Sequence, residues 1–233
     1  MKVTTVVTSF NRFDLLVQCV CSLEKYFDGE IIIIEDSANE EMQNKVVEQF
    51  SHHTLILNEV NLGLIQSIDK AYSHVKTPFV FHTEDDYIFT QGGFIEDSLS
   101  VLESDPAFNM VWIKGLDEAK RTHYPLSEQK MVGDIPYHII LPKSPNPKHG
   151  WKGFCFQCGL RSMKAYRQIA PYDDLICEWT DENGKVQGGN HITNREKACD
   201  TAYDKLGYRS AILTEKYAEH KGYLKSTYGL KNR

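Results

Sequence analysis

Three consecutive carboxylates, Glu84, Asp85 and Asp86, are the residues whose type and spacing point most directly to chemistry. They end a mainly apolar run over residues 78–82, which predicts a buried strand, and open α/β sheets place their ligands at the carboxyl ends of such strands. Adjacent carboxylates repel one another unless a cation neutralises them. Because hard cations prefer oxygen ligands, the run predicts a Mg²⁺ or Mn²⁺ site that phosphate oxygens complete. The alternative is an acidic turn that faces water.

Composition limits the class of protein. A chain of 233 residues with 41% hydrophobic content can bury one sizeable core, which favours a single domain. The net charge of −6 and the scattered Lys and Arg residues argue against nucleic acid as a partner, because phosphate neutralisation needs a concentrated basic face. No apolar run is long enough for a transmembrane segment, and the polar opening residues do not suit a signal peptide, so we expect a cytoplasmic protein.

The first 90 residues alternate between strand and helix patterns. Predicted strands cover residues 3–8, 31–34, 54–57 and 78–82, and predicted helices follow Asn11 and cover residues 40–50 and 64–75. Asn11 is the predicted N-cap of the first helix, with Asp14 in its first turn. This order predicts a parallel sheet covered by helices, in a Rossmann-like nucleotide-binding half at residues 1–90. The segment has neither a dinucleotide-binding glycine pattern nor a P-loop, which argues against both chemistries.

The second half, residues 91–233, is less regular. Predicted helices cover residues 94–102, 162–170 and 195–206, and predicted strands cover residues 109–114, 154–160 and 208–213. Residues 117–150 suit a variable loop over a cleft, and residues 171–194 suit a lid or binding loop. No linker divides the chain, so the prediction is one α/β domain with a mostly parallel central sheet flanked by helices.

Single residues offer weaker signals. Cys155 and Cys158 have C-x-x-C spacing, but no second pair accompanies them, which favours reduced thiols over zinc or redox chemistry. His82, within the strand before the acids, is expected to be structural. Trp112 belongs in the core, while Trp151 and Trp179 lie in or beside predicted loops.

Four segments together resemble the GT-A glycosyltransferases, in particular family 2, over nearly the whole chain. They read VVTSFNR at residues 6–12, IIEDS at 33–37, NLG at 61–63 and EDD at 84–86. The first resembles the family's opening strand and turn, and the second its acidic strand end, where an aspartate contacts the base. The fourth stands where the family carries its D-x-D metal motif.

The resemblance implies a role for each matched residue. Asp86 would hold a Mn²⁺ or Mg²⁺ ion with Glu84, and His220 matches a histidine that supplies a further metal ligand in several GT-A enzymes. The residues implied around the nucleotide sugar are Thr8, Ser9, Asn11, Arg12, Asp36, Asn61 and Asp85.

The implied catalytic base departs from the family pattern. Family members often carry a Glu-Asp pair at the start of a helix that ends in Gly-Tyr-Arg, and the aspartate is the base. Here LGYR at residues 206–209 keeps the ending, but the corresponding start reads NREK at residues 194–197. Counting back from Gly207 puts Glu196 in the aspartate's place, and Asp200 is the alternative.

The implied function is metal-dependent, inverting transfer of a sugar, of the hexosyl or deoxyhexosyl class. The donor would be a nucleotide diphosphate sugar, and the acceptor a hydroxyl of a glycan, lipid-linked glycan or protein. Two alternatives stay open. A non-catalytic nucleotide-sugar-binding relative would explain the altered base position. A sugar nucleotidyltransferase would need a glycine-rich basic turn after its first strand, and residues 8–12 contain no glycine.

Overall fold

The computed structural model describes residues 2–117, 124–142, 152–175, 179–180, 186–187 and 192–222. Within them, nine strands form one sheet in the order β3-β2-β1-β4-β9-β6-β12-β8-β7. The strands are β1 (Val3–Ser9), β2 (Ile31–Glu35), β3 (Thr54–Leu57), β4 (Phe79–Glu84), β6 (Phe108–Trp112), β7 (Lys130–Val132), β8 (Ile135–Ile139), β9 (Gly159–Ser162) and β12 (Arg209–Leu213). Strands β3, β2, β1 and β4 are parallel, as predicted for the first half.

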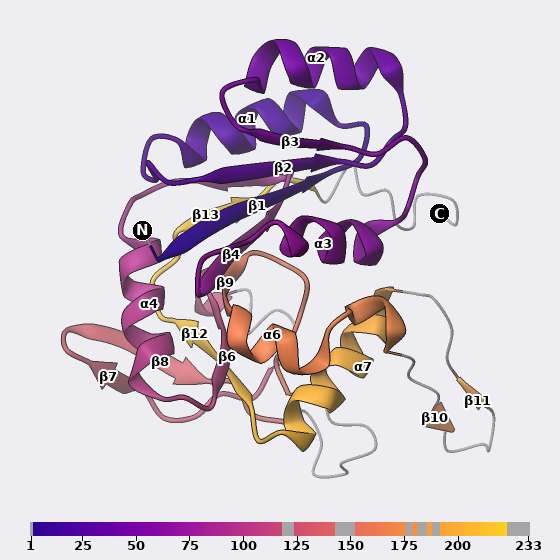
Figure 1. The fold of residues 1–233 in the computed structure, drawn as a ribbon. Helices are drawn as coiled ribbons and strands as arrows, with labels where there is room; N and C mark the ends of the chain where they lie inside the picture. The colour runs from indigo at the N-terminus through magenta and orange to yellow at the C-terminus, as the bar shows by residue number, and fades with distance from the viewer. Residues whose placement is uncertain are drawn as a thin grey trace.

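Helices cover both faces of the sheet (Figure 1). Buried side chains of α1 (Phe13–Leu23), α2 (Glu40–Phe50) and α4 (Phe94–Ser104) share one hydrophobic cluster. Those of α3 (Leu64–Ser73), α6 (Met163–Ile169) and α7 (Ile192–Lys205) share the cluster on the other face. The described part of the chain therefore has three layers, helix, sheet and helix, as the sequence pattern predicts.

The isoleucine run of β2 explains why this strand lies inside the sheet. Ile31 and Ile33 pack with α1 and α2, whereas Ile32 and Ile34 pack with α3. Successive side chains of a strand point to opposite faces, so only a strand covered on both sides can bury all four. Each such burial stabilises the fold by about 1.5–3 kcal/mol.

The entry to α1 differs from the prediction. Arg12, not Asn11, is the N-cap residue of α1, and its side chain makes no capping hydrogen bond. Asn11 has a φ of 53°, and its backbone N–H donates a 2.9 Å hydrogen bond to Oε1 of Glu35. Asparagine tolerates this left-handed conformation, so the residue forms the tight turn between β1 and α1 instead of capping the helix.

The second half departs further from the sequence pattern. Residues 130–139, predicted as loop, contain β7 and β8, which extend the sheet at its edge. The strand predicted at residues 154–160 begins only at Gly159, and β9 runs antiparallel to both β4 and β6. A separate two-stranded sheet pairs β5 (Tyr87–Phe89) with β13 (Ala218–His220), which brings the chain after β12 back to the acids.

The remaining elements are short. They are the 3₁₀ turn η1 (Tyr172–Asp174) and the paired strands β10 (Trp179–Thr180) and β11 (Val186–Gln187). Trp112 is buried as predicted, at 1% exposed, while Trp151 and the side chain of Trp179 lie outside the described residues. Cys155 and Cys158 are buried free thiols. No helix among the described residues is long and apolar enough to cross a membrane.

Candidate active site

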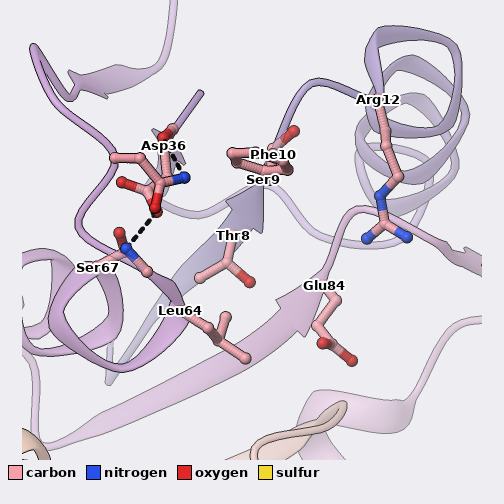
Figure 2. Close-up of a pocket in the computed structure, with 10 residues that line it drawn as sticks. Thr8, Ser9, Phe10, Arg12, Asp36, Leu64, Ser67 and Glu84 are labelled. Carbon is pink, nitrogen blue, oxygen red and sulfur yellow. Dashed lines mark hydrogen bonds between the residues drawn. The ribbon is translucent and has the colours of Figure 1, made fainter. Parts of the chain in front are cut away.

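A pocket of about 210 Å³ opens where the neighbouring strands β2, β1 and β4 end. Figure 2 shows its side chains pointing into the space between α1, α3 and the strand ends. The residues that line it are Thr8, Ser9, Phe10, Arg12, Asp36, Asn61, Gly63, Leu64, Ser67 and Glu84. Six of them are site residues expected from the sequence: Thr8, Ser9, Arg12, Asp36, Asn61 and Glu84. The strand order thus brings together segments that lie up to 76 positions apart in the chain.

Asp85 is buried beside the pocket and held by two donors. The hydroxyl of Ser9 donates a 3.0 Å hydrogen bond to Oδ2 of Asp85. Arg12 donates to both carboxylate oxygens, through Nε at 3.2 Å to Oδ2 and through Nη2 to Oδ1. A guanidinium that donates to both oxygens of a carboxylate forms a strong bidentate ion pair, so the Asp85 side chain is fixed in place.

Asp86 contacts both Arg12 and the segment of β13 that carries His220. Its Oδ2 accepts a 2.9 Å hydrogen bond from Nη1 of Arg12 and lies 3.4 Å from Nε2 of His220. Burial raises the pKa of Asp86, but His220 and Arg12 lower it by more, so the net pKa is below its ordinary value. Oδ1 of Asp86 is buried and finds no donor in the described part of the chain.

The backbone after β13 passes directly over Asp86. The N–H of Lys221 donates a 2.8 Å hydrogen bond to the backbone oxygen of Asp86. At Gly222, a Cβ atom would lie only 2.0 Å from Oδ2 of the same residue. A glycine is therefore required at position 222 for the backbone to pass this close to Asp86. In the same segment, the ring of His220 stacks on Tyr87 at a centroid distance of 4.8 Å.

Glu84 is the acid that faces the pocket. Burial and the neighbouring Asp86 and Asp85 raise its pKa to about 8, and Glu196 on α7 also contributes to the increase. No described residue donates a hydrogen bond to its carboxyl group. Glu84 is thus available for a ligand, in contrast to Asp85.

Asp36, expected to meet the nucleotide base, also organises the loop before α3. Oδ1 accepts 2.8 Å hydrogen bonds from Asn58 and from the N–H of Leu62, and Oδ2 accepts a 2.8 Å bond from the N–H of Gly63. A carboxylate has about four acceptor positions, so Asp36, which lines the pocket, keeps one position on Oδ2 that no described residue fills. Asn61 donates to the backbone oxygen of Asp36 at 3.2 Å.

The two candidate bases on α7 have different surroundings. Asp200 accepts 2.7 and 2.8 Å hydrogen bonds from the backbone N–H groups of Lys152 and Phe154, one on each oxygen. Glu196 accepts one 3.0 Å bond from the N–H of Phe156, on Oε1. Burial raises the pKa of Glu196 to about 7 and that of Asp200 to about 6.

Helix α7 begins earlier than the sequence pattern predicts. Its first residue is Ile192, which places Glu196 in the second turn instead of at the helix start. Glu196 therefore lies beyond the first turn, where an acid would complement the helix dipole.

The sequence interpretation missed several residues of the pocket. Phe10 is an aromatic ring 39% exposed at the pocket, and Leu64 and Ser67 on α3 complete the wall. The available signal for Phe10 was an aromatic residue among polar residues just after a predicted strand. Asn11, expected near the nucleotide, does not line this pocket and instead lines a hollow between α1 and α2.

The acids suit a divalent cation by the chemistry of their donor set. Asp86 offers a buried oxygen without a donor, Glu84 offers a carboxyl group without a hydrogen bond from the described residues, and His220 lies 3.4 Å from Asp86. Carboxylate oxygens with one imidazole fit Mn²⁺, and oxygens alone fit Mg²⁺.

Comparison with known structures places this architecture among the GT-A glycosyltransferases. The mannosyltransferase PcManGT from Pyrobaculum calidifontis, solved with GDP-Man and Mn²⁺, is 14% identical, with a TM-score of 0.56 over 90% of this chain and 53% of that chain. TarS 1-349 from S. aureus with UDP-GlcNAc is 14% identical, with a TM-score of 0.58 over 96% of this chain and 61% of that chain. This chain thus spans about half to three-fifths of their length.

The family follows from the sequence profile. The profile of glycosyl transferase family 2 matches residues 4–169, and the chain belongs to this family. No curated protein matches the chain. The matched range covers the pocket, Glu84, Asp85 and Asp86, and it ends before α7 and β13, which carry Glu196 and His220.

Proposed function

We propose that this protein transfers a sugar, of the hexosyl or deoxyhexosyl class, from a nucleoside diphosphate sugar to a hydroxyl acceptor. The observation that carries the proposal is the pocket at the ends of β2, β1 and β4, bordered by Glu84 and backed by Asp85 and Asp86. Residues 1–90 form the donor half, and residues 91–233 form the acceptor half. The acceptor belongs to the glycan, lipid-linked glycan or protein hydroxyls.

The donor nucleotide lies in the pocket. The remaining acceptor position on Asp36 receives a hydrogen bond from the base, and the exposed ring of Phe10 offers a flat apolar surface for stacking. Thr8 and Asn61 supply polar groups around the ribose. Because Asp36 also holds the backbone of Leu62 and Gly63, binding the base depends on the same carboxylate that shapes the loop.

The diphosphate lies against the acids and requires a cation. Asp86, with Glu84 and His220, would hold a Mn²⁺ or Mg²⁺ ion, and the ion would supply positive charge to offset that of the diphosphate. Arg12 contributes a second positive charge next to the same oxygens, and Asp85 orients its guanidinium. Arg12 and the ion would then both offset the charge of the leaving group.

Glu196 is the general base that deprotonates the acceptor hydroxyl. Its Oε1 is fixed by the N–H of Phe156, and its pKa of about 7 suits a base at neutral pH. The charge of Glu196 also raises the pKa of Glu84 in the donor pocket. Asp200 has both oxygens engaged by backbone N–H groups, which suits a structural role. One base is enough for a single displacement, so the reaction inverts the anomeric centre.

A second candidate function is binding of a nucleotide sugar without transfer. The ion pairs of Arg12 with Asp85 and Asp86 favour it, because they neutralise these acids with a side chain of the protein itself. In that case the pocket binds the donor, but a divalent ion and a base are not needed.

The experiment that separates the two functions is hydrolysis of nucleotide sugars by the purified chain, measured as released nucleotide with Mn²⁺ and with EDTA. GDP-mannose and UDP-GlcNAc are the first donors to test, since PcManGT and TarS were solved with them. We expect slow, Mn²⁺-dependent release with one donor, abolished in Asp86→Asn. A donor that binds tightly without release under either condition would support the binding protein.

A further inference from the structure

A cluster of three side chains, Glu24, His52 and His53, lies where α1 and α2 end, away from the pocket. Glu24 is the C-cap residue of α1, and His52 and His53 follow the end of α2 at Phe50. β3 begins at the next residue, Thr54, so the cluster lies at the starting edge of the parallel strands. The donor pocket lies at their carboxyl ends, on the opposite edge of the sheet.

The three side chains converge on one point. Nε2 of His52 lies 3.0 Å and Nε2 of His53 lies 2.9 Å from the same oxygen, Oε1 of Glu24. The two imidazole rings lie 4.1 Å apart between centroids, and the three ligand atoms all lie within 4.8 Å of one another. Among the described residues, no other group of at least three His, Cys, Asp or Glu side chains meets this distance.

The backbone around the cluster favours a positive charge. Neither α1 nor α2 has a basic residue in its last turn, so nothing in those turns offsets the negative ends of their dipoles. Glu24 adds a negative charge at the end of α1. A cation bound here would meet two helix ends and a carboxylate, each of which attracts it.

The histidines are suited to act as ligands. Imidazole nitrogens are common zinc ligands, and of the two rings the more buried is that of His53. Its ring lies beside Phe50 at a centroid distance of 6.5 Å, and its backbone N–H donates to the oxygen of Phe50, so its place is set. His52 is 58% exposed and can adjust its ring.

We propose that Glu24, His52 and His53 form a zinc site with water in the remaining position. Two imidazole nitrogens and one carboxylate oxygen are a donor set that Zn²⁺ accepts, and it favours borderline metals over Mg²⁺ and Ca²⁺. Zinc bonds of about 2.0–2.2 Å place tetrahedral ligand atoms about 3.3 Å apart. Both histidine Nε2 atoms, which lie 3.0 and 2.9 Å from Oε1 of Glu24, would therefore move slightly apart from it to bind the ion. The ion links the end of α1 to the turn between α2 and β3, and the site does not depend on the reaction at the donor pocket.

The test is calorimetric titration of the untagged chain with Zn²⁺ in excess Mg²⁺, which occupies oxygen sites such as the acids of β4. We expect one zinc bound with micromolar affinity in the native chain. Glu24→Gln and His52→Asn should each weaken this binding by about 10-fold or more, because each removes a ligand. The matched control is His74→Asn, an exposed histidine at the end of α3, which should bind zinc as the native chain does.

Two further readouts distinguish a site from adventitious binding. Zinc at about 100 times its Kd should raise the Tm of the native chain by about 5 °C and leave the Tm of Glu24→Gln nearly unchanged. Co²⁺ should give the visible absorption of a four- or five-coordinate ion in the native chain only. Absence of zinc binding in the native chain would show that the triad is hydrogen-bonded without metal. Equal binding by the native chain, Glu24→Gln and His52→Asn would also overturn the proposal.

Discussion

Nη1 of Arg12 lies 2.9 Å from Oδ2 of Asp86, and the same guanidinium also grips Asp85. Arg12 is the N-cap residue of α1, and Asp86 lies two residues after the end of β4, so the contact joins two elements that meet only in the folded chain. Among the described residues, the guanidinium of Arg12 forms ion pairs with both acids. A divalent ion at Asp86 must therefore share the site with Arg12.

Replacing Arg12 tests this balance. In EDTA, Arg12→Ala should lower the free energy of unfolding by up to about 3–5 kcal/mol, because it removes the guanidinium that neutralises two buried carboxylates. Mn²⁺ should restore part of this loss and stabilise the variant more than it stabilises the native chain, which thermal unfolding with and without Mn²⁺ measures. The matched control is Lys2→Ala, which removes an exposed pair with Glu103 and should cost under about 1 kcal/mol. An equal response of Arg12→Ala and the native chain to Mn²⁺ would count against the account.

Asp36 is predicted to act on both the loop and the nucleotide. Asp36→Ala should weaken nucleotide binding by about 1–3 kcal/mol, since it removes a charged acceptor and frees the N–H groups of Leu62 and Gly63. Calorimetry gives the affinity, and hydrogen exchange should detect faster exchange at these two amides. Unchanged affinity in a folded variant would show that the carboxylate serves the loop alone.

The two acids of α7 should separate in kinetics. Glu196→Gln should reduce transfer by about 10²–10⁴ with nearly unchanged donor affinity, the range for a lost general base. Asp200→Asn should mainly lower the Tm, because it weakens the acceptors of the Lys152 and Phe154 amides. If Asp200→Asn were folded and inactive while Glu196→Gln transferred sugar normally, the role of base would belong to Asp200.

The pH dependence of sugar transfer follows from the pKa of Glu196. Burial raises the pKa of Glu196 to about 7, and a base must be deprotonated, so kcat/KM should rise with pH up to about 7 and level off above it. The contribution of Glu196 to the free energy of unfolding changes with pH in the opposite direction. The raised pKa means that the folded state holds its proton more tightly than the unfolded state, so this group's contribution is full below about pH 4.5 and is lost as pH rises through about 7.

A pH profile of kcat/KM for the native chain and Glu196→Gln checks this prediction. The limb near pH 7 should be absent from the residual activity of Glu196→Gln. The same limb in both enzymes would assign it to another group.

The first half of the fold could be predicted because its strands and helices are encoded locally. The isoleucines of β2 admit only a strand buried on both faces, and the apolar spacing of α3 admits only one inward face. The strand pairing of the second half could not be predicted from the sequence. β9 reaches its place between β4 and β6 by long-range pairing, and β13 pairs with β5 over more than a hundred residues, which no local pattern encodes.

The candidate site followed the same division. The strand-end acids and Asp36 could be placed because parallel strands bring their carboxyl ends to one edge. The ion pairs of Arg12 and the backbone N–H groups around Asp36 could not, because they depend on the φ of 53° at Asn11 and on the loop before α3. Gly222 is a further case, since only the folded chain reveals that its backbone passes over Asp86.

The central claim is that a divalent ion at Asp86 joins the protein to the donor's diphosphate. Calorimetry of GDP and UDP with Mn²⁺ and with EDTA, on the native chain and on Asp86→Asn, tests it most directly. The account predicts that Mn²⁺ strengthens binding of the preferred nucleotide by about 10-fold or more in the native chain, equivalent to about 1.4 kcal/mol, and has little effect in Asp86→Asn. Equal affinity of the native chain for that nucleotide with Mn²⁺ and with EDTA would contradict it.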